Sequence, residues 1–541
     1  MDAAGRFDPV LEMTLGNGRA GPGDHGEGGH ERETAEGSHE DSAVIRPRAE
    51  QGSGSRPTRS SMMVLMAGRT GSRDMRMARR MLLAVGAAYL VAQLLLFSPD
   101  RAPSWDEAIY LSQVSPGVHA IAFAPSRARG ISLLVSPITM AGGSIRAVRL
   151  SLAALSSVAL VGSFLLWVPA LGLGVPVAAF LFASTWVGLF YGSEVMPNLW
   201  AAVLAVAAAG AFVRRVEDGA RWGAIAVAVL VGLMALVRPA DALVLSGAFA
   251  LYVLLFRRSS KRELVSVGAG LTIGWGAWLV EMSVRFGGPA RAIREAAALG
   301  HLTALGVGER VLQNLALTNG PIIGPEAHPD MPVAGVLWWG TTVALAGVAV
   351  VRTRSPMRGA VLCAVFGGSA LAAEYLVLVS GLAPRFLLPA YALLSLPAGT
   401  GLLSLLSGGA ARRIGGAAAV AVLAGLTAWQ VGTARTIGTN AAAARERVAA
   451  VGGEVGRLAA GRPCVVASAG AFPQVAFASR CAGRGLAGTD AASLTALRSS
   501  VPPDERLFVV LPTAPPAGSP LASTPPVSVE GWFVFELPPG A

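Results

Sequence analysis

The sequence predicts an all-α polytopic membrane protein with about 11 transmembrane helices and a small C-terminal α/β domain outside the membrane. Hydrophobic residues make up 53% of the 541 positions and charged residues only 14%, whereas a soluble domain carries about 25% charged residues. So few charges cannot solvate the surface of a soluble protein of this length. Apolar stretches long enough to cross a bilayer, about 20 residues each, alternate with short arginine-rich loops.

The net charge of +11 comes almost wholly from arginine, because Lys261 is the only lysine. In a soluble chain such a basic balance would indicate a nucleic-acid partner. In a membrane protein, loop arginines set the orientation of the helices. We therefore expect no nucleic-acid partner and a multi-pass protein of the cell membrane.

Residues 1–80 predict a disordered cytoplasmic tail. The segment is polar and glycine-rich, acidic up to Glu50 and basic toward Arg79 and Arg80. It holds too few apolar side chains to build a core. Because no apolar stretch precedes its basic cluster, we do not expect a cleavable signal peptide.

Residues 81–437 predict the transmembrane domain. Eleven apolar stretches are centred near residues 90, 158, 181, 205, 231, 249, 272, 342, 369, 395 and 426. Basic residues crowd the loops on one side: Arg214, Arg215, Arg221, Arg257, Arg258, Lys261, Arg262, Arg352, Arg354, Arg358, Arg412 and Arg413. By the positive-inside rule these loops are cytoplasmic, so the N-terminus is cytoplasmic and the C-terminus extracytoplasmic. Nearly all acidic residues of the membrane region then fall on the outer side.

Residues 438–541 predict a small extracytoplasmic α/β domain. A helical stretch leads to the β-like runs PCVVAS, LFVVLP and WFVFEL, which proline-rich turns separate. Cys464 and Cys481 would lie in an oxidising compartment, where a disulfide or two free thiols are both open, because sequence alone gives no distance. Cys363, within an apolar helix, is interpreted as a packing residue.

The first outer loop opens with PSWDEAIYLSQV, which places Asp106 and Glu107 shortly after the first helix. Adjacent carboxylates at a membrane surface can act as a general base, as a pair of metal ligands, or as negative charge at a helix N-terminus. The sequence leaves all three open. A divalent metal is compatible with the pair, but no cofactor is required.

Two further groups of polar residues fall on the outer side. Arg127 and Arg129 follow in APSRARG, where guanidinium groups can hold a phosphate bidentately or simply snorkel to the interface. The second outer loop, YGSEVMPNLW, carries Tyr191, Glu194 and Asn198 in a turn too short to form a domain. We predict that both groups contribute to substrate binding.

The outer ends of three later helices are also charged. LVRPADALVL places Arg238 and Asp241 at the end of the fifth helix, where a charged pair is costly unless it is paired or functional. A local salt bridge between the two is the alternative to a binding role. Glu374 lies near the end of the ninth helix beside a tyrosine, and Arg385 opens the tenth in APRFLLPAY. We expect all of these side chains to face one chamber.

Four of these segments, WDEAIY, YGSEVMPNLW, LVRPADALVL and APRFLLPAYALLSLPAG, resemble in order the motifs of the GT-C superfamily of membrane glycosyltransferases. The likeness is to the dolichyl-phosphate-mannose protein mannosyltransferases and the lipid A aminoarabinose transferases, and it covers roughly residues 81–406. It implies a GT-C-like fold. It also implies transfer of a sugar from a polyprenyl-phosphate donor to an extracytoplasmic glycan, lipid or protein acceptor.

The resemblance assigns roles to particular residues. It implies that Asp106 activates the acceptor as the candidate base, with Glu107 as its neighbour, and that Arg127, Arg129 and Arg385 hold the donor phosphate. Two departures leave the sugar and the acceptor open. PSRARG stands where the family often has an HPP segment, and an asparagine follows the proline of the second loop where the family often has aspartate, which weakens a two-carboxylate metal site.

A transporter or flippase of lipid-linked glycans is the main alternative from another class. Transporters place ionisable groups near the bilayer midplane and often contain two corresponding broken helices. In this sequence the charges gather on one face, and no clear internal repeat relates the two halves. The sequence also lacks an evident glycine-rich nucleotide loop, as expected for a lipid-linked donor. Glycosyl transfer is therefore the favoured prediction.

Overall fold

The computed structural model describes residues 59–257, 262–296, 333–355, 357–378 and 383–538. The chain divides into two units, Met1–Thr70 and Gly71–Ala541. Helix α1 (Arg59–Leu96) begins within the predicted disordered tail, so residues 59–80 are helical. This part of the prediction is wrong because the stretch is free of proline and rich in methionine and arginine, which favour helix. The rest of the predicted tail, residues 1–58, lies outside the described residues.

Each of the eleven predicted crossings is centred in a helix, and in the described part of the chain eight helices are long and apolar enough to span a membrane. The predicted helical membrane fold is therefore confirmed. The helices that contain the centres are α1, α4 (Ile145–Leu165), α6 (Gly174–Ala183), α8 (Pro197–Asp218), α9 (Arg221–Val237), α10 (Pro239–Phe256), α11 (Glu263–Phe286), α14 (Val333–Arg352), α15 (Met357–Ala373), α16 (Leu388–Leu406) and α17 (Ala410–Ala459).

The crossing predicted near residue 181 is broken. Helix α6 stops at Ala183, and a second short helix, α7 (Trp186–Tyr191), starts after Thr185. The hydroxyl of Thr185 accepts a hydrogen bond from the Gly188 N–H at 3.1 Å, which caps α7 and separates it from α6. The four-residue helix α5 (Val168–Leu171) lies in the turn before α6.

Helices α8 and α16 form the centre of the helical body, with 78% and 89% of their apolar spans buried. Small residues let α16 approach its neighbours closely. A Cβ atom on Gly401 would lie 1.9 Å from the carbonyl oxygen of Leu345 on α14, and one on Gly399 would lie 2.6 Å from that of Gly174 on α6. Such close backbone contact is typical of helix packing within membranes.

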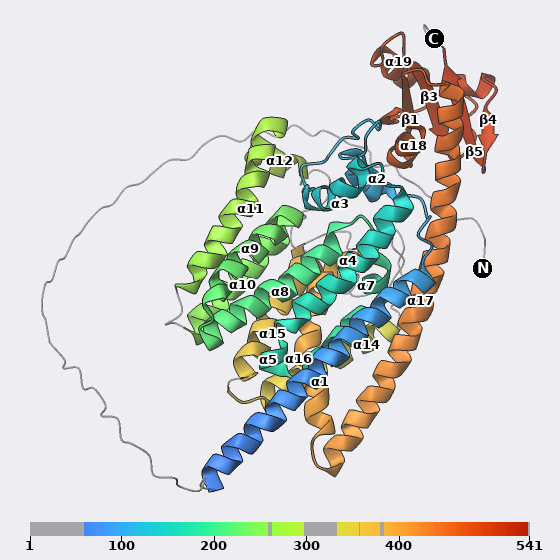
Figure 1. Cartoon of the computed structure of the whole chain (residues 1–541). Helices are drawn as coiled ribbons and strands as arrows, with labels where there is room; N and C mark the ends of the chain where they lie inside the picture. The colour runs from blue at the N-terminus through green and yellow to red at the C-terminus, as the bar shows by residue number, and fades with distance from the viewer. Residues whose placement is uncertain (1–58, 258–261, 297–332, 356, 379–382, 539–541) are drawn as a thin grey trace, which may run out of the picture. The chain divides into compact units, whose positions relative to one another are not determined.

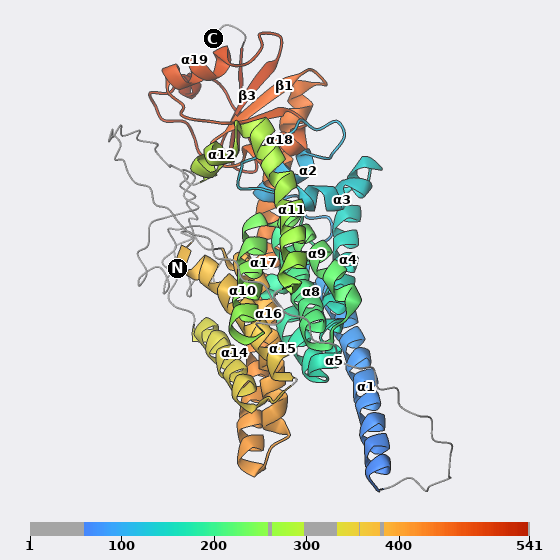
Figure 2. The same ribbon diagram turned by 90° about the vertical axis from the view of Figure 1, so that its left-hand side faces the viewer.

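The turns of the helical body fall at two opposite ends. The turns between α8 and α9, between α14 and α15, and between α16 and α17 lie at one end (Figure 1). The short helices α2 (Trp105–Ser112), α3 (Gly130–Met140) and α12 (Pro289–Ala296) lie at the other, together with the C-terminal domain, as Figures 1 and 2 both show. The predicted arginine-rich loops and the predicted site residues are thus at opposite ends.

The C-terminal domain is a five-stranded sheet in the order β2-β1-β3-β5-β4. Strands β2, β1 and β3 are parallel, and β5 pairs antiparallel with both β3 and β4. Its elements are β1 (Cys464–Ser468), α18 (Phe472–Ser479), β2 (Ala482–Gly485), α19 (Ala491–Ser499), β3 (Arg506–Leu511), β4 (Val527–Val529) and β5 (Trp532–Leu537), with short helix η5 (Pro520–Ser523) before β4. The predicted α/β domain is confirmed, and Cys464 and Cys481 form a disulfide.

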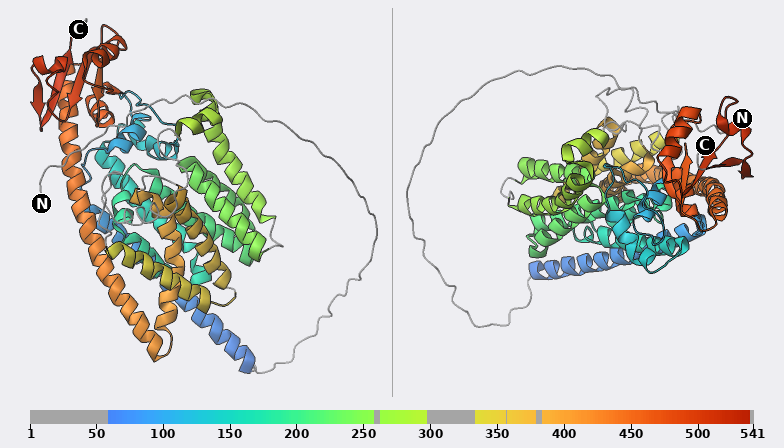
Figure 3. Two further views of the ribbon diagram at one scale, coloured as in Figure 1. Left: turned by 180° about the vertical axis from the view of Figure 1, so that it is seen from behind. Right: turned by 90° about the horizontal axis from the view of Figure 1, so that it is seen from above.

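Helix α17 joins the helical body to this domain without a break (Figure 3). The predicted domain boundary at residues 437 and 438 therefore falls inside a continuous helix, and the sheet starts only at Cys464. The boundary was misplaced because the change from apolar to polar composition along α17 does not interrupt its helical backbone. Helix α18 of the domain packs on α2, where the ring of Phe472 lies edge-on to Trp105 at 5.1 Å between centroids.

Candidate active site

Helix α2 sets the directions of the two adjacent acids that the sequence singled out. Ser104 caps the helix: its hydroxyl accepts a hydrogen bond from the Glu107 N–H at 3.4 Å, and Glu107 Oε2 accepts one from the Ser104 N–H at 2.8 Å. This capping box fixes Glu107 against the helical body. Asp106, one position earlier, points elsewhere on the helix, and its side chain is 21% exposed, whereas that of Glu107 is 0% exposed.

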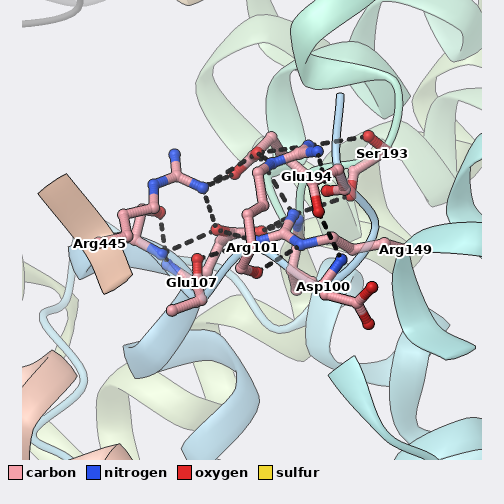
Figure 4. Close-up of polar contacts among 11 residues, drawn as sticks. Asp100, Arg101, Glu107, Arg149, Ser193, Glu194 and Arg445 are labelled. Carbon is pink, nitrogen blue, oxygen red and sulfur yellow. Dashed lines mark hydrogen bonds and ion pairs between the residues drawn. The ribbon is translucent and has the colours of Figure 1, made fainter. Parts of the chain in front are cut away.

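Glu107 belongs to a group of five buried charged side chains, which we call the buried ion cluster (Figure 4). Its members are Arg101, Glu107, Arg149, Glu194 and Arg445. None of the five side chains is more than 9% exposed. They come from the segment after α1, from α2, α4, the turn before α8, and α17, so the cluster joins parts of the chain that are far apart in sequence.

Every carboxylate oxygen in the buried ion cluster has a guanidinium partner. Arg149 binds Glu107 with both terminal nitrogens, at 3.0 and 3.1 Å. Arg445 lies between the acids, 3.2 Å from Glu107 Oε2 and 3.0 Å from Glu194 Oε2. Arg101 Nε donates to Glu194 Oε1 at 2.7 Å. Burial opposes ionisation of Glu107, but Arg149 and Arg445 outweigh it and hold the pKa of this carboxyl well below its usual range.

Asp106 forms a second and more open group with Arg127 and Arg385, which we call the Asp106 cluster. Arg127 Nη2 lies 2.6 Å from Asp106 Oδ1, and Arg385 Nη2 lies 3.1 Å from Oδ2. The exposed fractions of the three side chains lie between 17% and 21%. Burial opposes ionisation of Asp106, but Arg385 and Arg127 lower the pKa of this carboxyl below its ordinary value. Asp106 is therefore a carboxylate at neutral pH.

Aromatic rings support both guanidinium groups of the Asp106 cluster. Arg127 lies over the ring of Tyr110 at 5.3 Å, and Arg385 over that of Phe386 at 5.0 Å. Arg385 also interacts with the hydroxyl of Tyr191 on α7. Stacking fixes the plane of a guanidinium group while its N–H groups stay free to bind an anion.

The predicted pair Arg238 and Asp241 forms the local salt bridge, at 3.0 Å, but it has further partners. The hydroxyl of Tyr375 accepts a hydrogen bond from Arg238 and donates one to Asp241. Tyr375 lies with Glu374 in a single turn of π-helix, η3 (Glu374–Leu378), a distortion that often occurs at functional sites. The ring of Phe386 packs against Arg238 as well as Arg385, so this group adjoins the Asp106 cluster.

Arg129 lies outside both groups. Its Nε donates to Glu281 of α11 at 2.6 Å, and its guanidinium lies 4.7 Å from the ring centroid of Phe123. Arg129 Nη1 also donates to the side-chain oxygen of Gln113 at 3.4 Å. In the described part of the chain Arg127 contacts Asp106 and Arg129 does not, so the structure separates the two arginines that lie close together in the APSRARG segment.

Several predicted site residues carry buried polar atoms that lack a hydrogen-bond partner within the described part of the chain. They are Asp241 Oδ2, Glu374 Oε2, Arg385 Nε, Arg129 Nη2 and both amide atoms of Asn198. Buried polar atoms are normally paired, so each such atom calls for an explanation. A polar ligand provides one here, because the carboxylate oxygens need hydrogen-bond donors and the guanidinium N–H groups need acceptors.

Within the described ranges no three His, Cys, Asp or Glu side chains form a metal-binding group. Both oxygens of Asp106 contact guanidinium nitrogens, and Glu107 is held by Arg149 and Arg445. The two acids of the DE pair point to different partners. They therefore do not share one ion in this arrangement.

Solved structures provide the comparison that decides the fold. ArnT from Cupriavidus metallidurans bound to undecaprenyl phosphate superposes with a TM-score of 0.61 at 14% identity, over 84% of this chain and 97% of that one. Its apo form gives a TM-score of 0.58 at 15% identity. The archaeal oligosaccharyltransferase AglB from Archaeoglobus fulgidus, in complex with an inhibitory peptide and a dolichol-phosphate, gives 0.52 at 11% identity, over 80% of this chain and 69% of that one.

The chain has the GT-C fold. This confirms the GT-C-like fold that the resemblance implied. No family model and no curated protein matches the sequence, so the GT-C fold is visible in the three-dimensional arrangement and not in overall sequence similarity. Within that fold, segments from α2, the loop before α3, α10, η3 and η4 (Pro384–Leu387) bring Asp106, Arg127, Asp241, Glu374 and Arg385 to one end of the helical body.

Proposed function

We propose that this protein is an integral membrane glycosyltransferase that moves a sugar from a polyprenyl-phosphate-linked donor to an acceptor outside the cytoplasm. One observation carries the proposal: a partly exposed carboxylate, Asp106, shared between two stacked guanidinium groups and adjoining buried polar atoms without partners. The GT-C structures that superpose on the chain, one with undecaprenyl phosphate and one with a dolichol-phosphate, support the same class of donor.

Arg127 and Arg385 provide the binding site for the donor phosphate in this proposal. In the free protein their positive charge is directed at Asp106. The phosphodiester of the donor carries one negative charge, as a carboxylate does, and its two unesterified oxygens accept bidentate hydrogen bonds from guanidinium groups. The unpartnered Nε of Arg385 offers it an additional N–H. We therefore expect the donor phosphate to compete with Asp106 for the two arginines.

This competition also activates Asp106. Once the phosphate takes the guanidinium groups, Asp106 loses the charges that lower its pKa, while burial still raises it. The carboxylate then accepts the proton of the acceptor hydroxyl. The hydroxyl oxygen bonds to the anomeric carbon of the sugar, and the bond from that carbon to the phosphate oxygen breaks. Polyprenyl phosphate leaves with an additional negative charge, which Arg127 and Arg385 stabilise.

The neighbouring group around Arg238 is proposed to bind the sugar. Asp241 Oδ2 and Glu374 Oε2 are buried acceptors without donors, and sugar hydroxyls supply donors. Tyr191 supports Arg385, and Asn198 and Arg129 remain proposed substrate contacts through their unpartnered atoms. Glu107 and Glu194, which the sequence placed in the site, are fully paired within the buried ion cluster, so we assign them a structural role.

The arrangement in the membrane is likewise a proposal. The turns that carry Arg221, Arg354 and Arg413 lie at the end opposite α2, and the positive-inside rule assigns that end to the cytoplasm. The Asp106 cluster and the C-terminal domain then lie outside. A lipid-linked donor fits this placement, because its tail stays in the bilayer while its phosphate and sugar reach the outer surface.

Proteoliposomes that contain the purified protein test the proposal against a transporter or flippase. They are supplied with polyprenyl-phosphate sugars labelled in the sugar and with glycan, lipid and peptide acceptors. We expect label to pass to an acceptor and free polyprenyl phosphate to appear in equal amount. If the intact donor only changes leaflet, with its sugar–phosphate bond unbroken, the protein is a transporter and the proposal fails.

A further inference from the structure

The end of the helical body opposite α2 contains a hollow that the proposed reaction does not use. Arg352 at the end of α14, Arg354 in the next turn, and Arg412 at the start of α17 line it, together with Val351 and Ser404. Three arginines, two from the end of α14 and the turn after it and one from the start of α17, thus line one concave surface. The positive-inside rule explains why arginines lie at this end, but it does not require them to gather around one hollow.

Two arginines elsewhere at the same end are neutralised by acids, whereas those that line the hollow are not. Arg215 pairs with Glu263, and Arg257 pairs with Glu217. In the described part of the chain no carboxylate lies within ion-pair distance of the arginines that line the hollow, and all three are exposed. The hollow therefore carries a formal charge of +3 that the protein itself leaves uncompensated, which favours an anionic ligand.

The hollow continues into apolar surface on the same helices. Val351, which lines it, is 80% exposed, and Val343, two turns earlier on α14, is 57% exposed. Ile414, one turn after the start of α17, is 72% exposed. A ligand that places a phosphate against the arginines and hydrocarbon chains along the apolar side chains would match both the charged hollow and the apolar surface beside it. A soluble phosphate satisfies only the first.

We propose that this hollow is a binding site for the phosphate headgroup of an anionic phospholipid, with Arg352, Arg354 and Arg412 as its ligands. Basic pockets between transmembrane helices bind such headgroups through the same chemistry. The site lies at the opposite end from the Asp106 cluster, so it binds lipid independently of the donor. It anchors the α16–α17 turn and the end of α14 to the surface of the bilayer.

The test compares two variants with equal loss of charge. In the first, Arg352, Arg354 and Arg412 are replaced by glutamine. In the matched control, Arg221, Arg358 and Arg413, which are exposed at the same end but do not line the hollow, are replaced by glutamine. Native mass spectrometry of the purified proteins then measures retention of phosphatidylglycerol and of phosphatidylcholine, with inorganic phosphate and polyprenyl phosphate as competitors.

We expect the wild type and the control to retain phosphatidylglycerol in preference to phosphatidylcholine, and the first variant to bind it about ten-fold or more weakly, given about 1 kcal/mol for each arginine near a lipid surface. Equal losses in both variants would show unspecific charge attraction and overturn the proposal. Effective competition by inorganic phosphate would overturn the choice of a lipid. Displacement by polyprenyl phosphate of the phosphatidylglycerol that the wild type retains and the first variant does not would overturn the choice of a phospholipid. Circular dichroism and size-exclusion profiles establish that both variants are folded.

Discussion

The two neighbouring acids of α2 lie in opposite environments. Glu107 is enclosed, and every oxygen of it and of Glu194 is paired with arginine. Asp106, one residue earlier, has a side chain that is 21% exposed. It pairs with Arg127 and Arg385, and Nε of Arg385 is a buried polar atom without a hydrogen-bond partner in the described part of the chain. Complete pairing and burial indicate a structural role, whereas incomplete pairing next to an opening indicates a place for a ligand.

The helix itself produces this difference. Successive side chains on an α-helix point about 100° apart, since one turn takes 3.6 residues. The capping box directs Glu107 toward α4 and α17, so Asp106 must point away from them. The two adjacent carboxylates, which look like one catalytic pair in the sequence, therefore have different roles: Glu107 stabilises the fold, and Asp106 faces the proposed active site.

The largest effect is expected for substitution of Glu107, which should impair folding, whereas the equivalent substitution of Asp106 should not. Replacing Glu107 by glutamine leaves the three arginines of the buried ion cluster with a single acid, Glu194, and breaking a buried ion pair costs about 3–5 kcal/mol. We expect the E107Q protein to be lost from the membrane or to aggregate in detergent. The same chemical change at the neighbouring acid, D106N, is the matched control, and its melting temperature should stay close to that of the wild type. A stable E107Q protein would contradict the structural role of Glu107.

The next effect is on donor binding. We expect Arg385→Gln to weaken binding of polyprenyl phosphate roughly 10- to 100-fold, because charge-assisted hydrogen bonds contribute about 1.5–3 kcal/mol each. Isothermal titration in detergent measures the affinity. Arg146→Gln is the control: Arg146 pairs with Asp100 at the same end of the molecule, but both side chains are at least 60% exposed, and among the described residues neither contacts the Asp106 cluster. If both variants lose the same affinity, polyprenyl phosphate responds only to the overall positive charge at this end of the protein and not to Arg385 in particular.

The pH dependence of catalysis tests whether the donor releases Asp106. In the free protein its pKa lies below 3.8, its ordinary value, so Asp106 loses its charge, and with it both ion pairs, only as the pH falls below that value. We therefore expect the acid limb of kcat/KM, which reports the free protein, to lie below about pH 4. The acid limb of kcat, which reports the donor complex, should lie at higher pH because the arginines have turned to the phosphate. If the acid limbs of kcat and kcat/KM lie at the same pH, the donor does not release Asp106 from its arginines.

The smallest effect is expected at Arg129. Its guanidinium is 29% exposed and pairs with Glu281 of α11, away from Asp106. Partly exposed pairs contribute about 1 kcal/mol or less. Arg129→Gln should raise KM for the donor several-fold at most and leave kcat unchanged, as initial-rate kinetics would show. A loss as large as that of Arg385→Gln would place Arg129 with the phosphate-binding arginines.

Much of the fold follows from hydropathy and loop charge. All eleven apolar stretches became helices, because a 20-residue apolar run in a membrane must satisfy its backbone hydrogen bonds internally. The break between α6 and α7 escaped prediction because Ser184 and Thr185 are only two polar residues between two strongly apolar stretches, so the run as a whole stays apolar. The continuous α17 was missed for the opposite reason: its composition changes while its backbone does not.

The candidate site was only partly predictable. Three of the four motifs contain Asp106, Asp241 and Arg385, and the structure places these residues, together with Glu374 of the ninth predicted helix, at one end of the helical body. The sequence gave no sign of Arg445, which meets Glu107 across 338 positions, since such a contact exists only in the folded chain. Arg101 and Glu281 were missed likewise. Without Arg445 in view, Glu107 resembled a second catalytic acid.

One measurement tests the central claim most directly: donor binding and sugar transfer measured side by side for D106N protein that retains the melting temperature of the wild type. Because Asp106 competes with the phosphate for Arg127 and Arg385, we predict that D106N binds polyprenyl phosphate at least as tightly as the wild type. Without a base, its rate of transfer should fall by about 10²- to 10⁴-fold. Transfer at the full rate, or weakened binding of polyprenyl phosphate, would contradict the account.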